Sequence, residues 1–166
     1  MVRLFATVLL VCAVLATSLV GGSPAWAITA PELRSQRSLQ ELQPDMHGRD
    51  LKQQEFLKAE LAGFDFSGAD LRGAVFNGSN LQQSNLQGAD LEDAVAYASR
   101  FEGADLRDAV LRNAMLMQSH FAGADITGAD FSDAVLDLPE QKALCRKATG
   151  TNSRTGISTR DSLACR

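Results

Sequence analysis

A large apolar residue returns at every fifth position between residues 49 and 138, without one insertion or deletion. The eighteen centres are Leu51, Phe56, Leu61, Phe66, Leu71, Phe76, Leu81, Leu86, Leu91, Ala96, Phe101, Leu106, Leu111, Leu116, Phe121, Ile126, Phe131 and Leu136. A period of five fits neither a helix of 3.6 residues per turn nor the two-residue alternation of a strand. Units that cannot bury their apolar side alone must stack, so the repeat predicts a solenoid.

Small residues accompany the centres at fixed offsets. Ala or Ser stands two residues before almost every centre, which would let the backbone close around a narrow core. Glycine recurs two residues after the centre, at Gly63, Gly68, Gly73, Gly78, Gly88, Gly103, Gly123 and Gly128. Because glycine tolerates unusual backbone dihedrals, we expect a tight corner at that position.

Three units, Ala69–Gly73, Ala89–Asp93 and Ala104–Asp108, resemble the A(D/N)LXX unit of the pentapeptide-repeat family. The resemblance extends over residues 49–138 and implies an all-β solenoid, a right-handed quadrilateral parallel β-helix with four units per coil. The centre and the small residue would face inward. Eighteen units would make about 4.5 coils with a length of about 22 Å at the spacing of neighbouring strands.

The repeat departs from that unit at a few positions. Arg49, Gln54 and Phe64 replace the small inward residue, so the first coil is expected to be the least regular. Ala96 replaces a large centre, and we expect a packing deficit there.

Residues 1–27 are predicted to be a signal peptide. A short positive start ending at Arg3 precedes the apolar run Leu4–Val20, and Ala25-Trp26-Ala27 has the small-x-small form of a cleavage site. The alternative is an uncleaved membrane anchor, because the apolar run approaches the length of a membrane span. With cleavage we expect an exported protein without membrane insertion.

Charge is distributed unevenly along the part that would remain. Residues 49–138 hold fifteen acidic and seven basic side chains, whereas residues 139–166 hold two acidic and six basic ones. A nucleic-acid interface needs clustered Lys and Arg and a high pI, so nucleic acid is not an expected partner.

Helical caps are predicted on both sides of the repeat, since exposed ladder edges promote end-to-end association. In residues 28–48, Thr29 and Glu32 form a capping-box pattern ahead of a thin apolar face. In residues 139–166, Asp137 and Glu140 suggest a second capping box, followed by a helix and a tail.

Two cysteines, Cys145 and Cys165, follow the repeat. In an exported chain an isolated pair favours a disulfide, here closing a loop of about 20 residues and contributing roughly 3 kcal/mol. The alternatives are a redox switch and a metal site, although no His lies near either thiol.

The tail carries a second, shorter resemblance. Residues Leu144–Asn152, followed by Thr155-Gly156 and Ser162–Cys165, are similar to the C-terminal end of pentapeptide-repeat proteins of the thylakoid lumen and their cyanobacterial relatives. This resemblance implies an oxidising compartment, either the thylakoid lumen or the periplasm.

A register of 20 residues sorts the outward side chains into columns. Val75, Val95, Met115 and Val135 share one column, with Tyr97 and Met117 beside it. Contiguous exposed apolar surface marks interaction sites, so these six residues are the candidate interaction face. The alternatives are that outward valines merely favour β structure, or that a terminal segment covers them.

Acidic residues also fall into columns. Asp50, Asp70, Asp90 and Asp130 share one, interrupted by Val110, and Asp65, Asp105 and Asp125 share another. Calcium needs six to eight converging oxygens, whereas a flat column presents carboxylates in parallel. We therefore expect no metal or cofactor, and a surface ladder neutralised by Lys52, Arg72 and Arg112.

These patterns favour a non-enzymatic exported protein that acts as a protein-interaction or structural accessory factor for an unidentified protein partner, with a homodimer left open. His47 and His120 are isolated, and a rod packed with large side chains offers no cleft for catalysis. One alternative is a DNA mimic like the gyrase-binding members of the family. Another is a thiol-redox-responsive lumenal protein.

Overall fold

The computed structural model describes residues 44–166. The predicted signal peptide and the predicted helix before residue 44 lie outside the described residues. Within the described part, no helix is both long and apolar enough to cross a membrane.

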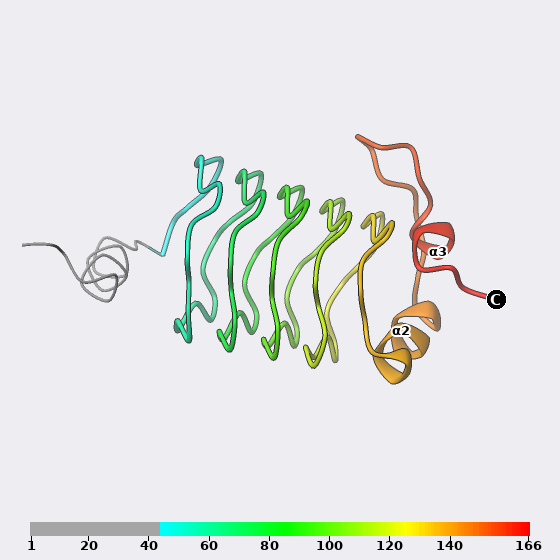
Figure 1. Cartoon of the computed structure of the whole chain (residues 1–166). Coiled ribbons are helices and arrows are strands. Elements are labelled where there is room, and N and C mark those ends of the chain that lie inside the picture. The colour runs from blue at the N-terminus through cyan, green and yellow to red at the C-terminus, as the bar shows by residue number, and fades with distance from the viewer. Residues whose placement is uncertain (1–43) are drawn as a thin grey trace, which may run out of the picture. The chain divides into compact units, whose positions relative to one another are not determined.

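Residues 45–135 form a parallel ladder in which each paired residue meets the residue twenty positions later. Four columns of pairs start at Asp45, Asp50, Glu55 and Glu60, so four pentapeptides complete one coil (Figure 1). Each unit contributes one paired residue because the two residues after its centre turn the corner. This is the register of a four-sided parallel β-helix built from short paired positions rather than long strands.

The ladder begins earlier than the repeat pattern suggests. Asp45 pairs with Asp65, and the backbone N–H of Met46 donates to the carbonyl of Asp65 at 2.7 Å. Met46 is 2% exposed and occupies the position of a centre. The unbranched methionine side chain fills this place, although residues 44–48 lack the A(D/N)LXX pattern.

The core consists of the centres and of the small residues two positions before them. Every centre from Phe56 to Phe131 is at most 1% exposed. Phe56 stacks on Phe76 with ring centroids 4.9 Å apart, and Phe101 and Phe121 repeat that distance. Ala96 is completely buried at the register position between Phe76 and Leu116. The predicted inward orientation of the centres is therefore confirmed.

The corners adopt the left-handed backbone conformation. Two residues after the centre, φ is positive in every unit from Gly48 to Asp133, for example 65° at Gly73, 57° at Asn113 and 52° at Lys58. The expectation from the recurring glycines is correct. Non-glycine residues adopt the same conformation because the ladder on both sides fixes the corner.

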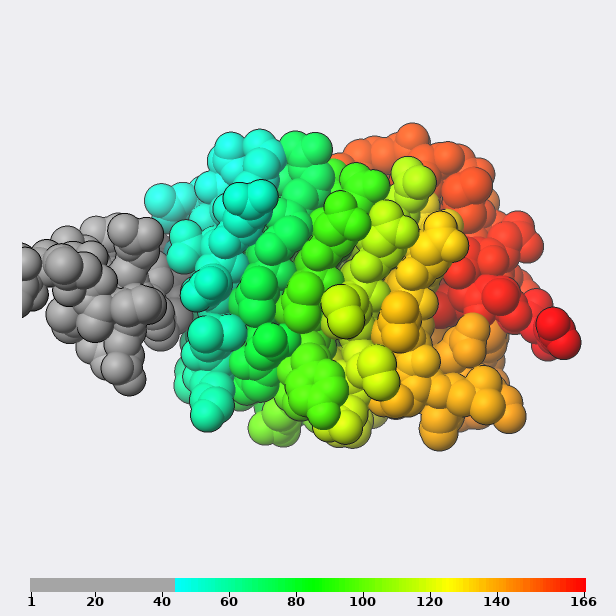
Figure 2. Space-filling model, in the orientation of Figure 1, coloured from blue at the N-terminus to red at the C-terminus, as the bar shows by residue number. Residues whose placement is uncertain are grey.

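Two helices follow the ladder, α2 (Leu138–Cys145) and α3 (Thr159–Ser162). Figure 1 shows α2 continuing directly from the last coil, and Figure 2 shows the orange and red C-terminal segment packed against the coils before it. The short helix α3 has no counterpart among the sequence-based expectations. Its N-cap, Ser158, accepts a hydrogen bond from the backbone N–H of Asp161.

The capping box expected at the start of α2 does not form. Asp137 makes no side-chain cap, and its carboxylate instead accepts from the backbone N–H of Gln118 at 2.6 Å. Glu140 similarly accepts from the N–H of Phe121 at 2.7 Å. Elsewhere such N–H groups donate to carbonyls nineteen residues later, in the next coil. The two carboxylates take the place of those carbonyls, because the ladder has no further coil to offer there.

Candidate interaction surfaces

The candidate interaction face lies on one side of the coil. Its column pairs Val75 with Val95, Val95 with Met115 and Met115 with Val135. Met115 is 50% and Val135 46% exposed, Tyr97 and Met117 in the adjacent column are 44% and 40% exposed, and Val75 and Val95 are half-buried. The structure thus brings the six predicted residues into one strip, called the apolar face below.

Sequence reasoning missed one member of this surface. Leu57 is 42% exposed and falls in the same register column as Tyr97 and Met117. The signal was available, since adding 40 to position 57 gives position 97. Asn77 stands between them, and its side-chain oxygen accepts from the N–H of Tyr97 at 3.0 Å.

The acidic columns have a local structural cause. An oxygen of the side chain before the centre accepts from the backbone N–H two residues later, at 2.9 Å in Asp65, 3.2 Å in Asn85 and 3.1 Å in Asp105. Such Asx turns explain why Asp or Asn precedes the centre so often. The carboxylates therefore stabilise the corners rather than reach toward a common ion.

Several of these carboxylates also pair with cations. Arg72 donates to Asp70 at 2.7 Å, and Lys52 lies 3.1 Å from the same carboxylate. The hydrogen bond from Arg72 holds the pKa of Asp70 well below its ordinary value, and Arg107 lowers the pKa of Asp105 in the same way. Across residues 44–166, no three His, Cys, Asp or Glu side chains are grouped to hold a metal ion.

His47 is less isolated than its place in the sequence suggests. The register places it beside Ser67, with 2.8 Å between the imidazole Nδ1 and the hydroxyl oxygen. The Ser67 hydroxyl donates to Asp65 at 2.6 Å, so its proton points away from the imidazole. The imidazole then donates to Ser67 and cannot activate it as a base. The contact is a surface hydrogen bond within the first coils.

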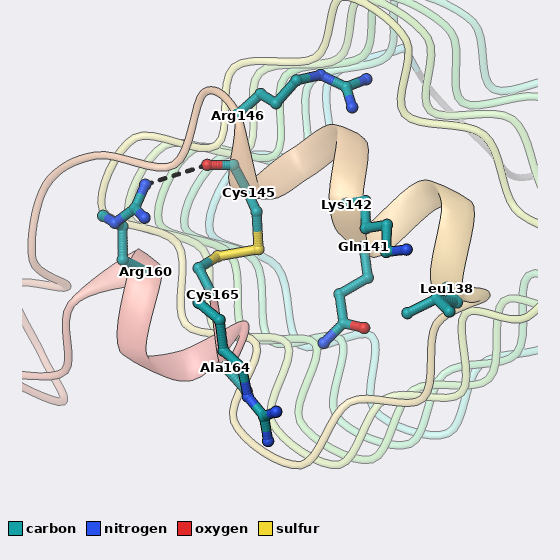
Figure 3. Close-up of a pocket in the computed structure, with 9 residues that line it drawn as sticks. Leu138, Gln141, Lys142, Cys145, Arg146, Arg160, Ala164 and Cys165 are labelled. Carbon is teal, nitrogen blue, oxygen red and sulfur yellow. Dashed lines mark hydrogen bonds between the residues drawn. A yellow bond between two sulfur atoms is a disulfide. The ribbon is translucent and has the colours of Figure 1, made fainter.

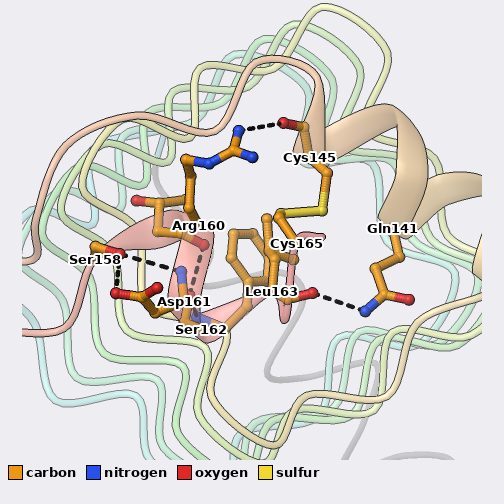
Figure 4. Close-up of a disulfide and its surroundings, with 10 residues drawn as sticks. Gln141, Cys145, Ser158, Arg160, Asp161, Ser162, Leu163 and Cys165 are labelled. Atoms are coloured by element: carbon orange, nitrogen blue, oxygen red, sulfur yellow. Dashed lines mark hydrogen bonds between the residues drawn. A yellow bond between two sulfur atoms is a disulfide. The ribbon is translucent and has the colours of Figure 1, made fainter.

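A disulfide joins Cys145, the last residue of α2, to Cys165 (Figure 4). The Cα atoms lie 5.5 Å apart, and both half-buried cysteines pack against the core. Beside the bridge, Arg160 donates to the carbonyl of Cys145 at 3.2 Å, and Gln141 donates to the carbonyl of Leu163 at 2.8 Å. These contacts hold the last residues against α2.

A hairpin around residues 151–158 runs back along the coil. Its paired ends are Thr151 and Ser158, and the buried Asn152 side chain donates to the carbonyl of Gly128 at 2.9 Å. Arg154 extends further along the coil than Asn152, and its guanidinium lies 3.6 Å from the carboxylate of Asp90.

The hairpin lies over the column that contains Val110 and Asp130, which are 5% and 0% exposed. Val110 interrupts the acidic column at a place that the hairpin buries, so the apolar residue avoids a second buried carboxylate. Burial raises the pKa of Asp130, but hydrogen bonds from Ser132 and Thr155, together with the charge of Arg112, leave it below its ordinary value. This segment therefore covers a column other than the apolar face.

A cavity of about 760 Å³ opens at the C-terminal end, beside the disulfide. It lies between α2 and the last residues of the chain (Figure 3). The lining includes Leu138 and four cations, Lys142, Arg146, Arg160 and Arg166. We call it the cationic pocket.

A family model described as pentapeptide repeats matches residues 55–95 and 97–136 with eight copies. The two matched ranges are separated by a single residue, Ala96, the small centre.

Two of the individual relatives come from Arabidopsis thaliana. The thylakoid lumenal protein TL20.3 of Arabidopsis thaliana chloroplasts is 66% identical over 38 residues, 23% of this chain and 14% of that protein. This chain therefore spans only a small part of that relative. A solved pentapeptide repeat protein from the Arabidopsis thylakoid lumen is 35% identical, over 73% of this chain and 91% of its own, with a TM-score of 0.39.

A further solved structure is HetL of the cyanobacterium Nostoc sp. strain PCC 7120, a pentapeptide repeat protein involved in heterocyst differentiation regulation. It is 27% identical, over 63% of this chain and 46% of its own, with a TM-score of 0.42. Because these TM-scores are low, the relationship rests on sequence identity and on the repeat.

Proposed function

The chain belongs to the pentapeptide-repeat family, and from that premise we propose that it is a non-enzymatic interaction or structural accessory protein of the thylakoid lumen or periplasm. The observation that carries the proposal is the apolar face. Four of its side chains are at least 40% exposed on a coil whose centres from Phe56 to Phe131 are at most 1% exposed. A protein partner that covers this surface would remove apolar area from water.

The composition of the face suits an adaptable contact. Met115 and Met117 have flexible, polarizable side chains, and Tyr97 offers an aromatic ring with a polar tip. Two successive columns carry these residues, so the surface is held by the ladder and needs little ordering on binding. The partner would therefore meet a rigid, preformed strip.

The relatives support the proposed compartment. The matched Arabidopsis proteins are lumenal, and the disulfide between Cys145 and Cys165 suits an oxidising environment. The predicted signal peptide agrees with the same location.

A non-enzymatic role is supported by where the side chains of the repeat point. The large residues of the repeat lie inside the coil. The Ser67 hydroxyl donates its proton to Asp65 and not to His47, so His47 does not activate Ser67 as a nucleophile. The cationic pocket contains cations and a disulfide but no Ser, Asp or Glu. The lining therefore offers neither a serine nucleophile nor a carboxylate general base, and its one amine, on Lys142, has no nucleophile beside it to activate.

The two alternatives make different demands on the molecule. A DNA mimic that binds gyrase would use the acidic columns, but Asp70 and Asp105 are paired with arginines, which reduces the negative charge presented there. A thiol switch would need the disulfide to open under physiological conditions, and both cysteines pack against the core.

The test is affinity capture of the tagged protein from lumenal extract after crosslinking. Val95→Lys and Met115→Lys place a charge on the apolar face, and Ala122→Lys adds the same charge at an exposed position outside it. We expect a specific partner to be recovered with the wild type and with Ala122→Lys, and to be lost with the other two. Equal recovery with all four proteins would eliminate the apolar face as the binding site.

A further inference from the structure

The cationic pocket gathers four cationic side chains. None of the salt bridges within residues 44–166 involves Lys142, Arg146, Arg160 or Arg166. The two acidic residues of the tail are occupied elsewhere. Glu140 accepts from the last coil, and Asp161 accepts from the Ser158 hydroxyl at 2.6 Å. Four like charges gathered around one cavity attract an anionic ligand.

The disulfide assembles this charge. Each cysteine is followed directly by an arginine, Arg146 after Cys145 and Arg166 after Cys165. The bridge holds the two Cα atoms 5.5 Å apart and thereby brings both arginines to the same cavity from positions twenty residues apart. Figure 3 shows Arg160 on the opposite side of the bridge from α2, reaching toward Cys145.

The length of the pocket indicates the kind of anion. Leu138 and Arg146 line it from the two ends of α2. At 1.5 Å per residue, they lie about 12 Å apart along the helix axis. An inorganic anion cannot span this distance, whereas an extended peptide of about four residues can. The cavity volume of about 760 Å³ lies within the range of ordinary ligand sites.

The lining also contains apolar surface. Leu138 is 59% exposed, and Ala164 and the disulfide contribute further apolar atoms. Cationic and apolar residues thus line the same cavity, which matches a segment that alternates carboxylate and apolar side chains. We infer that the cationic pocket binds an extended acidic peptide segment of a partner protein. These residues are distinct from the apolar face, so this site and the proposed function can fail separately.

The experiment measures fluorescence anisotropy of a short fluorescein-labelled peptide in which Glu and Leu alternate, with the full chain after signal removal. The same peptide with Gln in place of Glu is the control ligand. Lys142→Glu combined with Arg146→Glu reverses two exposed charges of the pocket, and neither residue takes part in a salt bridge within residues 44–166. Lys58→Glu combined with Arg112→Glu reverses two exposed charges on the coil.

We expect the Glu peptide to bind, the Gln peptide to bind at least about tenfold more weakly, and the pocket variant to lose about tenfold in affinity. The coil variant should bind like the wild type. Cys145→Ser with Cys165→Ser should also lose binding while far-UV circular dichroism and the urea midpoint of the coil show that the ladder is retained.

Equal loss in the pocket and coil variants would reduce the effect to general charge attraction and overturn the site. Retained binding in the double serine variant would overturn the assembly by the disulfide. Vesicles of anionic phospholipid serve as the second probe. Binding to vesicles that depends on Lys142 and Arg146, without binding to the Glu peptide, would contradict a peptide ligand.

Discussion

The Ser99 hydroxyl donates a 2.7 Å hydrogen bond to the carbonyl oxygen of Phe76, in the preceding coil. Ser79 and Ser119 repeat the relationship with the carbonyls of Phe56 and Ala96, each twenty-three residues earlier. All three serines are at most 2% exposed. The position tolerates Ser as well as Ala because the hydroxyl finds a carbonyl of the neighbouring coil inside the core.

Ser99→Ala should lower the free energy of unfolding by about 1 kcal/mol, the usual net value of a buried hydrogen bond. The change removes the bond to Phe76 and adds no volume. Urea denaturation followed by circular dichroism would measure it. An unchanged midpoint would mean that the hydroxyl contributes nothing beyond the alanine that occupies the same position at Ala59.

Asn152→Ala should detach the hairpin around residues 151–158. The side-chain amide lies within 3.2 Å of the carbonyls of Asp108, Ala109 and Gly128, and its oxygen accepts from two backbone N–H groups of the hairpin. Losing these buried bonds should cost about 2 kcal/mol. Hydrogen–deuterium exchange of the hairpin amides should accelerate.

Ser153→Ala is the matched control for that change, because Ser153 contacts Asp108 through its backbone N–H alone. Its exchange rates should equal those of the wild type. Accelerated exchange in both variants would contradict the role assigned to the Asn152 side chain.

Gly150→Ala should destabilise the tail more than Gly88→Ala destabilises the coil. Both glycines have positive φ, 81° and 64°. A Cβ at Gly150 would lie 2.8 Å from the nitrogen of Gly128, whereas a Cβ at Gly88 would meet nothing within 4 Å. The left-handed conformation costs about 1 kcal/mol in each case, and the clash should add at least about 1 kcal/mol at Gly150. Thermal unfolding of the two variants would compare their losses of stability. Equal losses would contradict the close approach of Gly150 to Gly128.

Acid should weaken the pairing of Asp70 with Arg72. The pKa of Asp70 is lowered in the folded protein, so the folded state binds fewer protons than the unfolded state as pH falls below about 4. The stabilisation is complete above that pH and is lost as pH falls toward the lowered pKa. Arg72→Ala should raise the pKa of Asp70 and reduce this loss. Urea unfolding at several pH values would measure how the free energy of unfolding falls with pH. Gln87→Ala is the uncharged control. The same pH dependence in Arg72→Ala as in the wild type would contradict the pairing.

Much of the coil could be predicted from the sequence, because each centre carries its own evidence of burial. If four units of five residues make one coil, each centre stacks on the centre twenty residues later. The sequence therefore already predicts that Leu71, Leu91 and Leu111 stack on one another. The recurrence at Gly73 and Gly78 likewise indicates the corner. The apolar face followed from the same arithmetic, although Leu57 was overlooked.

The C-terminal end could not be predicted in this way. Asp137 and Glu140 match a helix capping pattern locally, yet they accept from Gln118 and Phe121 because the last coil leaves those N–H groups without carbonyl partners. The hairpin that buries Val110 and Asp130 depends on the fit of Asn152 against three carbonyls, which no local pattern encodes.

The sequence by itself determined the period, the inward residues, the corners and the two cysteines, since a repeat imposes the same short-range packing on every unit. Only the tertiary structure decided how the ladder ends. There the partners are groups left open by the last coil, and the charges of the tail gather around Cys145 and Cys165 because contacts far apart in sequence place them together.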